Sequence, residues 1–240
     1  MPSVSVIVPV FNGASFLAGA VANIRGQSRP PEQIIVVDDG STDDSLAVAR
    51  SLGADVTVLT QKNGGPPAAR NRALEVVAGD FVTFLDVDDL WPPDKLAEQL
   101  QFFSDHPATD LVLGQTRLLM EAGGETPLRE GAQEDAATPL HLFLIGAALF
   151  RRSAFERIGV FDVSKRYADD LDWFLRARES ALQFHLMPRL ALIKRCHADN
   201  LTRGKSIADM GLAAVIRASL ARRRKMGGTV KPLDALRPLE

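Results

Sequence analysis

The sequence predicts an α/β fold in which a mostly parallel central sheet is flanked by helices. Along the first 105 residues, short runs rich in β-branched and aromatic residues alternate with segments of helical periodicity, a rhythm typical of a parallel sheet with crossover helices. The chain has 240 residues and is 46% hydrophobic, so it can bury a substantial core.

The predicted elements follow one another in a regular order. Four apolar runs are predicted strands, at 3–9, 33–37, 55–59 and 80–85. Four longer segments are predicted helices, at about 14–25, 42–52, 66–78 and 93–104. The second half is predicted to contain a strand at 110–120, an apolar stretch at 142–150, a helix at about 170–180, a strand pair within 183–196 and a last helix at about 207–224. The segment 121–139, rich in Gly, Glu, Thr, Ala and Pro, is predicted to be a mobile loop or a β-excursion.

Composition and charge narrow the class of protein. The net charge of -2 gives no basic signal, so nucleic acid is not an expected partner. Because Cys196 is the only cysteine, the chain cannot form an internal disulfide or a thiolate zinc site, and a reducing cytoplasm is the expected compartment. No segment approaches about 18 uninterrupted apolar residues, and the run at 4–8 lacks the flanks of a signal peptide, so no membrane span is expected.

Three carboxylates come directly after the predicted strand at 80–85. Asp86, Asp88 and Asp89 lie in the run FLDVDDLW, at the carboxyl edge where open α/β sheets bind ligands. Like charges so close together repel unless a cation lies between them, and Mg²⁺ or Mn²⁺ held by one or two carboxylates takes its other ligands from water and phosphates. The alternative is an acidic turn before a helix that starts at Pro92-Pro93.

The first two predicted strands also end in groups suited to a nucleotide. Asp39, in the run DDGSTD, can accept the imide N–H of uracil or the amino group of another base. Phe11 can stack on that base, which contributes about 1–3 kcal/mol. The alternatives are that Ser41 or Thr42 caps the following helix and that Phe11 belongs to the core.

A glycine- and proline-rich segment places two arginines near a helix start. Arg70 and Arg72 could contact phosphate or ribose oxygens there, although a solvated helix face is the more common place for arginine. The sequence has no GxGxxG after its first strand and no GxxxxGK[ST], which disfavours a dinucleotide dehydrogenase or a P-loop enzyme. Phosphates are therefore expected to be handled by a metal.

Several motifs together resemble one family. The runs VSVIVPVFNG, IIVVDDGSTDDS, NGGPPAARNRAL and GDFVTFLDVDDLWPPDKL resemble, in order and spacing, the nucleotide-sugar half of family 2 glycosyltransferases of the GT-A fold. The later runs IGAALFRRSAFERIGVFD, YADDLDWFLRARE and KRCHADNLTR resemble the acceptor half of the same family. The resemblance covers residues 3–203 and implies a GT-A-like sheet, a nucleotide-sugar donor and a divalent metal, Mn²⁺ or Mg²⁺.

The resemblance also assigns roles on the donor side. The residues that it assigns to nucleotide binding are Pro9, Phe11, Asp39, Arg70 and Asp86. Asp88 resembles the direct metal ligand of the family's DxD pair, while Asp86 would lie nearer the ribose and Asp89 would support either one. His197 resembles a histidine near the diphosphate or the metal, although a lone histidine is more often structural or exposed. The metal would neutralise the departing diphosphate.

On the acceptor side, Asp170 resembles the catalytic base that removes the proton from an acceptor hydroxyl, with inversion at the anomeric carbon. Asp169 stands where the family usually has Glu, which puts any acceptor contact of that residue in doubt. The alternative is that either residue caps a helix, whose N-terminus would lower the pKa of a carboxyl and weaken it as a base. Trp91 and Trp173 could border the sugar pocket or belong to the core.

The expected organisation is one GT-A domain over residues 1–225, followed by a tail at 226–240. Within it, about 1–105 form the nucleotide-sugar half, about 106–203 the acceptor half and 204–225 a C-terminal helix. The expected activity is inverting transfer from a nucleotide-diphosphate sugar, first of all a UDP-sugar. The alternatives are an inactive nucleotide-sugar-binding module and, less favoured, a haloacid-dehalogenase-type phosphatase, whose nucleophile loop would normally come earlier in the chain.

The acceptor and the protein partners stay open. A glycan, a lipid-linked compound and a small metabolite all fit the sequence. The last predicted helix is amphipathic and ends in the basic run 222–225, so it could pack on the domain, form a homodimer, or rest on the inner face of an anionic membrane.

Overall fold

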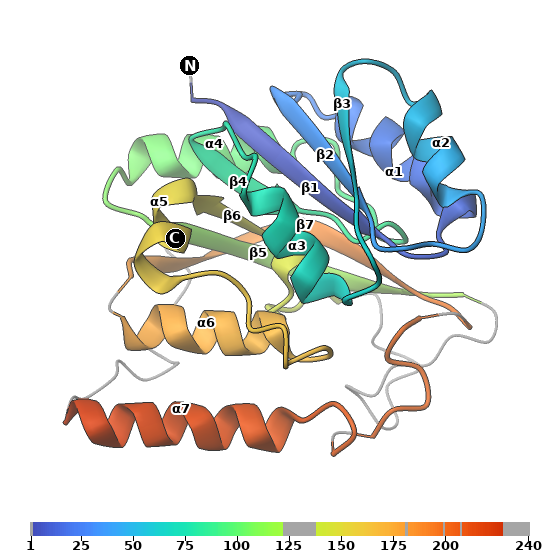
Figure 1. Ribbon diagram of the computed structural model, residues 1–240. Helices are drawn as coiled ribbons and strands as arrows, with labels where there is room; N and C mark the ends of the chain where they lie inside the picture. The colour runs from blue at the N-terminus through green and yellow to red at the C-terminus, as the bar shows by residue number, and fades with distance from the viewer. Residues whose placement is uncertain (1, 122–137, 181, 199, 207, 228–240) are drawn as a thin grey trace.

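The computed structural model describes residues 2–121, 138–180, 182–198, 200–206 and 208–227 (Figure 1). The strands of its sheet are β1 (Val4–Val10), β2 (Gln33–Asp38), β3 (Val56–Thr60), β4 (Phe81–Phe84), β5 (Leu111–Met120), β6 (Ala148–Arg151) and β7 (Phe184–Cys196). The α-helices are α1 (Ala14–Arg25), α2 (Ser45–Ser51), α3 (Pro66–Leu74), α4 (Lys95–Asp105), α5 (Arg152–Ile158), α6 (Asp169–Glu179) and α7 (Leu212–Met226). A 3₁₀ turn, η1 (Ile145–Ala147), precedes β6.

These strands form one seven-stranded sheet in the order β3-β2-β1-β4-β6-β5-β7. The pairs β1–β2, β2–β3, β1–β4 and β5–β7 are parallel, whereas β6 is antiparallel to both β4 and β5. Only β6 therefore runs against the other strands of the described sheet. The predicted mostly parallel α/β fold is confirmed, and β1 is buried along its whole length, as expected of a strand covered on both faces.

The predicted strand pair within 183–196 is wrong, because one long strand, β7, occupies this segment. Its register against β5 shifts between Leu113 and Gln115, where Met187-Pro188-Arg189 form a bulge instead of a turn. Pro188 has no N–H to donate and is accommodated at this irregularity. Gly114 lets the two strands approach here, since a Cβ on it would lie 2.4 Å from the Cβ of Ala191.

Other boundaries differ from the prediction for local reasons. The helix expected from 42 begins at Ser45, because Asp43 accepts hydrogen bonds from the N–H groups of Ser45 and Ala14 in a turn. The apolar stretch 142–150 divides into the turn η1 and the strand β6, and the short helix α5 after it was not predicted. Residues 122–137 of the predicted loop and 228–240 of the predicted tail lie outside the described part of the chain.

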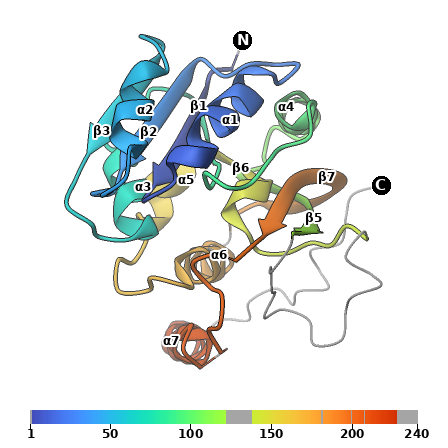
Figure 2. The ribbon, with the colours of Figure 1, turned by 90° about the vertical axis from the view of Figure 1, so that its right-hand side faces the viewer.

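The last two helices lie on one side of the sheet. Figure 2 looks nearly along their axes and shows α7 outside α6, farther from the sheet. Val215 and Ser219 form the buried side of α7, and Ser219 donates a hydrogen bond to Glu179 at the end of α6. The last helix thus packs on the domain, and it begins at Leu212 rather than 207.

Aromatic side chains join the sheet to α5 and α6. The ring of Trp173 lies 5.1 Å from that of Phe150 and 4.8 Å from that of Phe155, centroid to centroid.

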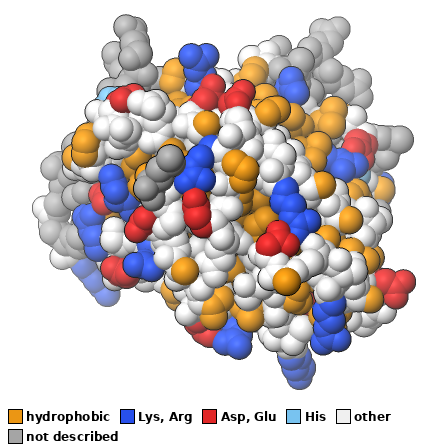
Figure 3. Space-filling model, turned by 90° about the horizontal axis from the view of Figure 1, so that it is seen from above, with side chains coloured by type: hydrophobic (Ala, Val, Ile, Leu, Met, Phe, Trp, Pro, Cys, Tyr) orange, Lys and Arg blue, Asp and Glu red, His pale blue; other side chains and the backbone are white. Residues whose placement is uncertain are grey.

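Among the described helices, none is both long enough and apolar enough to cross a membrane. On the face seen from above, basic and acidic side chains are interspersed (Figure 3).

Candidate active site

The candidate site lies at the carboxyl ends of β1, β2 and β4. The chain leaves β1 on one side for β2 and β3, then returns on the other side as β4. This reversal of strand order is the point at which open α/β sheets bind ligands. The positions of Phe11, Asp39 and Asp86 just beyond these three strand ends confirm that the sheet brings the predicted motifs to one edge.

Asp39 is buried and binds the loop that leads into α3. Its carboxylate accepts hydrogen bonds from Gln61 Nε2 at 2.7 Å and from the N–H groups of Gly64 and Gly65, both at 2.8 Å. A carboxylate offers about four lone-pair sites, so these three bonds leave roughly one for a base. Asp39 therefore shapes the nucleotide side of the site in addition to any contact with the nucleotide.

The two predicted residues on β1 have different surroundings. Phe11, directly after the strand, is 47% exposed, so its ring is open to a stacking partner and is not part of the core. Pro9 is buried inside the strand, opposite Val37 of β2. Its buried side chain offers no open stacking surface, and a nucleotide contact of Pro9 stays a prediction.

Arg70 on α3 joins the two halves of the chain. One terminal nitrogen donates to Asp169 Oδ2 at 2.5 Å, and the other donates to Asp86 Oδ1 at 2.8 Å. The Arg70 side chain is only 6% exposed, and the two carboxylates hold its pKa above the usual value despite burial. The two carboxylates take one N–H of each terminal nitrogen, and the buried Nε has no hydrogen-bond partner among the described residues.

Asp86 and Asp88 are held in different ways, although only one residue separates them. Burial opposes the charge of Asp86, but Arg70 and Lys194 outweigh it, and the pKa of this carboxyl lies below its usual value. Asp88 Oδ2 lies 3.1 Å from His197 Nε2 and accepts a hydrogen bond from Asn200 Nδ2 at 2.9 Å. The structure thus brings together the two residues that the resemblance assigns to the metal.

These two side chains fit a partly open metal site. An imidazole nitrogen and a carboxylate oxygen are suitable ligands for Mn²⁺, and the His197 ring is fixed by stacking on Phe16, 5.1 Å between centroids. Among the described residues, no group of three or more His, Cys, Asp or Glu side chains could hold a metal. A cation here would need further ligands from substrate phosphates and water, which is the usual arrangement for Mg²⁺.

Asp89 belongs to a buried link between the end of β4 and β7. Its carboxylate accepts a hydrogen bond from the N–H of Arg195 at 3.0 Å and lies 3.5 Å from Lys194 Nζ. The pKa of Asp89 is raised to about 7 by burial, with Lys194 opposing the shift and Asp88 and Asp86 adding to it. Asp89 thus ties the end of the acidic run to Lys194 and Arg195 of β7.

Asp170 lies at the start of α6 and lines a cavity beside Lys194 and Asn200. Its Oδ1 accepts the N–H of Leu171 at 2.7 Å, as expected at a helix N-terminus. The expected lowering of its pKa is nevertheless wrong: burial raises the pKa of Asp170 to about 7, with Asp169 adding to the shift and Arg70 opposing it. A carboxylate with a pKa near neutrality is a stronger base than an exposed one.

The two tryptophans support the site from within. Trp173 is completely buried, and its Nε1 donates to the carbonyl of Gly159. Trp91 is 2% exposed and donates to the carbonyl of Gly146. Of the two alternatives for these tryptophans, a sugar pocket or the core, the structure shows the core for both.

Sequence reasoning missed Lys194 and Asn200. Both lie in the run KRCHADNLTR, from which only His197 was singled out. Neither residue type is specific enough by itself, and strand pairing and the turn after β7 bring them to the acidic residues. Asn200 also accepts the N–H of His197 through its Oδ1 at 2.6 Å, so it positions both candidate metal ligands.

Comparisons with solved structures agree with this architecture. TarS 1-349 of S. aureus, in complex with UDP-GlcNAc, superposes with a TM-score of 0.70 at 20% identity, over 92% of this chain and 66% of that one. The mannosyltransferase PcManGT of Pyrobaculum calidifontis, in complex with GDP-Man and Mn²⁺, gives a TM-score of 0.65 at 24% identity, over 96% and 66%. The predicted GT-A-like fold is confirmed by these likenesses.

Sequence relatives identify the family to which the chain belongs. An uncharacterised glycosyltransferase of Rickettsia prowazekii is 30% identical over 213 residues, which cover 84% of this chain. The chain spans 66% of the length of that relative, just under two thirds. The family model named Glycosyl transferase family 2 matches residues 5–159, which include Asp39, Arg70 and the acidic run. Because this match covers more than half of the chain, the protein belongs to glycosyl transferase family 2.

Proposed function

We propose that this protein is an inverting, metal-assisted glycosyltransferase that moves a sugar from a nucleotide-diphosphate donor to an acceptor hydroxyl. One observation carries the proposal: Asn200 hydrogen-bonds Asp88 and also lines the cavity that contains Asp170. The candidate metal ligand and the candidate base are therefore parts of one continuous site. A diphosphate near Asp88 and a hydroxyl near Asp170 would meet within it.

The donor side fits a nucleotide-diphosphate sugar. Phe11 is exposed for stacking on a base, and Asp39 keeps one acceptor site for an imide or amino N–H. Asp86, whose carboxylate is fixed by Arg70, would accept hydrogen bonds from the ribose hydroxyls. The complexes of the structural neighbours with UDP-GlcNAc and GDP-Man support this donor class, and a UDP-sugar is the first candidate.

In the proposed reaction, the Asp170 carboxylate takes the proton from the acceptor hydroxyl. The acceptor oxygen forms a bond to the anomeric carbon while the bond from that carbon to the diphosphate oxygen breaks, so the configuration inverts. A divalent cation bound at Asp88 and His197, Mn²⁺ or Mg²⁺, would stabilise the charge on the departing diphosphate. Arg70 and Asp169 hold Asp86 and the start of α6 in position during this step.

The proposed division of labour follows the fold. Residues 1–105 supply the donor half and 106–203 the acceptor half, and Arg70 links them through Asp169. A binding module without catalysis would need only the donor half to bind its nucleotide. Its distinguishing property is that nucleotide binding persists while no transfer or donor hydrolysis is measurable with any acceptor.

Calorimetric titration of UDP, GDP and dTDP tests the donor side, each with Mn²⁺ and with EDTA. We expect one nucleotide to bind in a metal-dependent way, and Asp88→Ala to abolish that dependence. The matched control is Asp105→Ala, at the last residue of α4, where the exposed carboxylate accepts a hydrogen bond from the Gln101 amide. The absence of binding by every nucleotide under both conditions would contradict the metal and donor assignments together.

A further inference from the structure

The cavity beside Asp170 has an unusual lining for an acceptor site. Its volume is about 310 Å³, at the lower end of the range of about 300–1,000 Å³ that is usual for small-molecule sites. Its apolar wall comes from four separate segments of the chain: β5, the segment before η1, α6 and the start of α7. The residues of this apolar wall are Leu118, Leu142, Phe143, Leu144, Leu171, Met210 and Leu212.

The cavity is also lined by polar residues, several of which already have partners: His141, Tyr167, Asp170, Lys194, Cys196, Asn200 and Thr202. Lys194 lies against Asp89, and the Asn200 amide donates to Asp88. His141 Nε2 lies 2.9 Å from the carbonyl of Met187. An acceptor covered with hydroxyl groups would have to leave the ones that face leucine and phenylalanine without a hydrogen-bond partner, whereas an apolar body would not.

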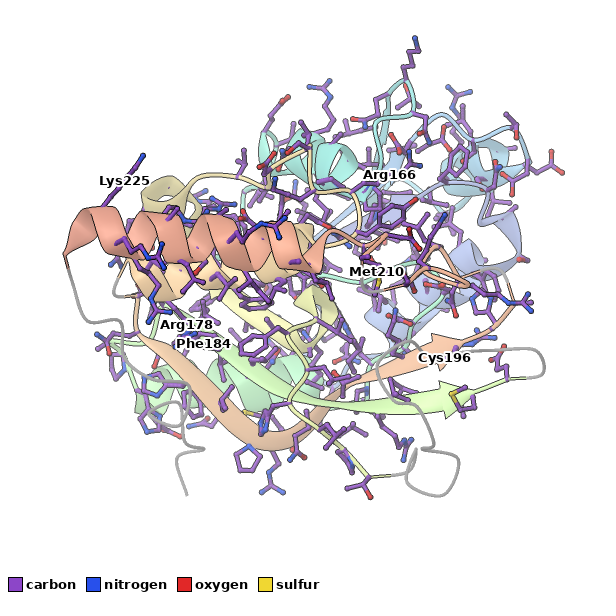
Figure 4. All side chains as sticks on the ribbon, turned by 90° about the horizontal axis from the view of Figure 1, so that it is seen from below. Arg166, Arg178, Phe184, Cys196, Met210 and Lys225 are labelled. Atoms are coloured by element: carbon purple, nitrogen blue, oxygen red, sulfur yellow. The ribbon has the colours of Figure 1, made fainter. Side chains whose placement is uncertain are left out.

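The apolar wall is held in place by the core behind it. The ring of Phe143 packs on those of Phe174 and Phe184, at 5.6 and 6.1 Å between centroids. Met210 is 7% exposed and closes the cavity from the segment that leads into α7. In the view from below, Met210 and Cys196 lie beyond the start of α7, whereas Lys225 lies at the opposite end of that helix (Figure 4). The wall is thus built by tertiary packing and is not a loose surface.

We propose that the acceptor carries its reacting hydroxyl next to an apolar body, which fills this cavity while the hydroxyl meets Asp170. The inference rests on the proposed function, because it takes Asp170 as the base. It narrows the acceptor from any hydroxyl compound to an amphiphile, and it disfavours an unsubstituted glycan. Two kinds of acceptor would combine a hydroxyl with an apolar body in this way, a phenolic compound and an alkyl-linked sugar.

Ligand binding tests this inference without a known donor. Saturation-transfer NMR titrations would compare 4-propylphenol, n-octyl β-D-glucopyranoside and methyl β-D-glucopyranoside, each with UDP and Mn²⁺ present. We expect at least one of the first two to bind at least tenfold more tightly than the methyl glucoside. The preference between phenol and octyl glucoside then identifies the source of the apolar body. Equal binding of all three compounds would overturn the inference.

Two neighbouring leucines on β5 provide a matched pair of variants. Leu118 lines the cavity, whereas Leu119 is 43% exposed and does not. We expect Leu118→Gln to weaken binding of the apolar probe at least tenfold and Leu119→Gln to leave it unchanged. Leu212→Gln, at the start of α7, is the second test should Leu118→Gln not fold. Unchanged binding in a folded cavity variant would contradict the inference.

Nucleotide titration of the same samples separates the two proposals. If UDP, GDP or dTDP binds with Mn²⁺ but no apolar probe does, the acceptor inference alone fails. If no nucleotide binds, the proposed function fails and the cavity is not an acceptor site. Once a donor is known, mass spectrometry of the glycosylated probe should show transfer to its hydroxyl in the wild type and a loss of at least tenfold in Leu118→Gln.

Discussion

Arg70 on α3 and Asp169 at the start of α6 form a buried ion pair, with 2.5 Å between Nη1 and Oδ2, although 99 residues separate them in the sequence. The same guanidinium binds Asp86 at the end of β4. Through this pair, the carboxylate proposed for the ribose and the helix that carries Asp170 share one cation. Asp169, where the family usually has Glu, is long enough for this contact.

Removing Arg70 should destabilise the fold. Arg70→Met leaves Asp169 charged and buried, and we expect the free energy of unfolding to fall by about 3 kcal/mol, as for other broken buried pairs. Urea denaturation measures this change. Arg72→Met on the same helix is the control, because Arg72 is 46% exposed and its pair with Glu75 contributes at most about 1 kcal/mol. Equal loss in the two variants would show that the buried pair has no special role.

Replacing the candidate base should separate chemistry from binding. Asp170→Asn keeps the side-chain shape but cannot accept the acceptor proton as a carboxylate does, so we expect kcat to fall by about 10²–10⁴-fold. The Kd of the donor nucleotide should stay within about twofold, as measured by calorimetry. Asp162→Asn, an exposed turn residue, is the control. Full activity in Asp170→Asn would remove this residue from the mechanism.

The pH dependence of transfer should report the environment of Asp170. Burial and Asp169 raise the pKa of Asp170 to about 7, and the base acts in its deprotonated form. The rate should therefore fall about tenfold for each pH unit below this pKa and level off above it. Profiles of kcat/KM against pH measure this acidic limb of the curve, and Asp170→Asn should remove it. A limb that persists in the variant would point to another group, such as Asp89, whose pKa also lies near 7.

Asn200 should act through the ligands that it positions. It donates to Asp88 and accepts the N–H of His197, so Asn200→Ala should weaken Mn²⁺-dependent nucleotide binding by about 10–100-fold. Binding measured in EDTA should not change. Lys205→Ala, in the same segment, is the control. Equal loss with and without metal would mean that Asn200 holds the nucleotide itself.

The outer side of α7 is the place to test for a membrane contact. Ile216 and Leu220 are 51% and 42% exposed, beside Arg217 and Arg224. If this side rests on an anionic membrane, flotation with anionic liposomes at low salt should capture the protein, and salt should release it. The double substitution Ile216→Glu/Leu220→Glu should abolish capture.

The matched control for α7 is Val160→Glu/Val163→Glu, which changes two exposed apolar residues outside that helix. Light scattering on the same samples reports whether α7 forms a homodimer instead. If the wild type ignores anionic liposomes, the membrane contact should be abandoned.

The sequence by itself determined the sheet and the edge that carries the site. The strands β1, β2 and β4 are short and rich in β-branched and aromatic residues, and the polar motifs follow them directly, so their parallel order brings Phe11, Asp39 and Asp86 together. Local pattern could not reveal that Pro188 lies in a bulge, because the partner strand β5 decides whether β7 continues. The same limit applied to Trp173, whose burial depends on rings from three other segments.

The tertiary structure decided the chemistry of the charged residues. A helix N-terminus predicts a lowered pKa for Asp170, yet burial and the neighbouring Asp169 carboxylate raise it. Arg70 looked like a nucleotide contact, and folding gave its terminal nitrogens to two carboxylates from distant parts of the chain. The reason is physical: backbone preference is set by neighbouring residues, whereas desolvation and charge depend on every group that packing brings within a few ångströms.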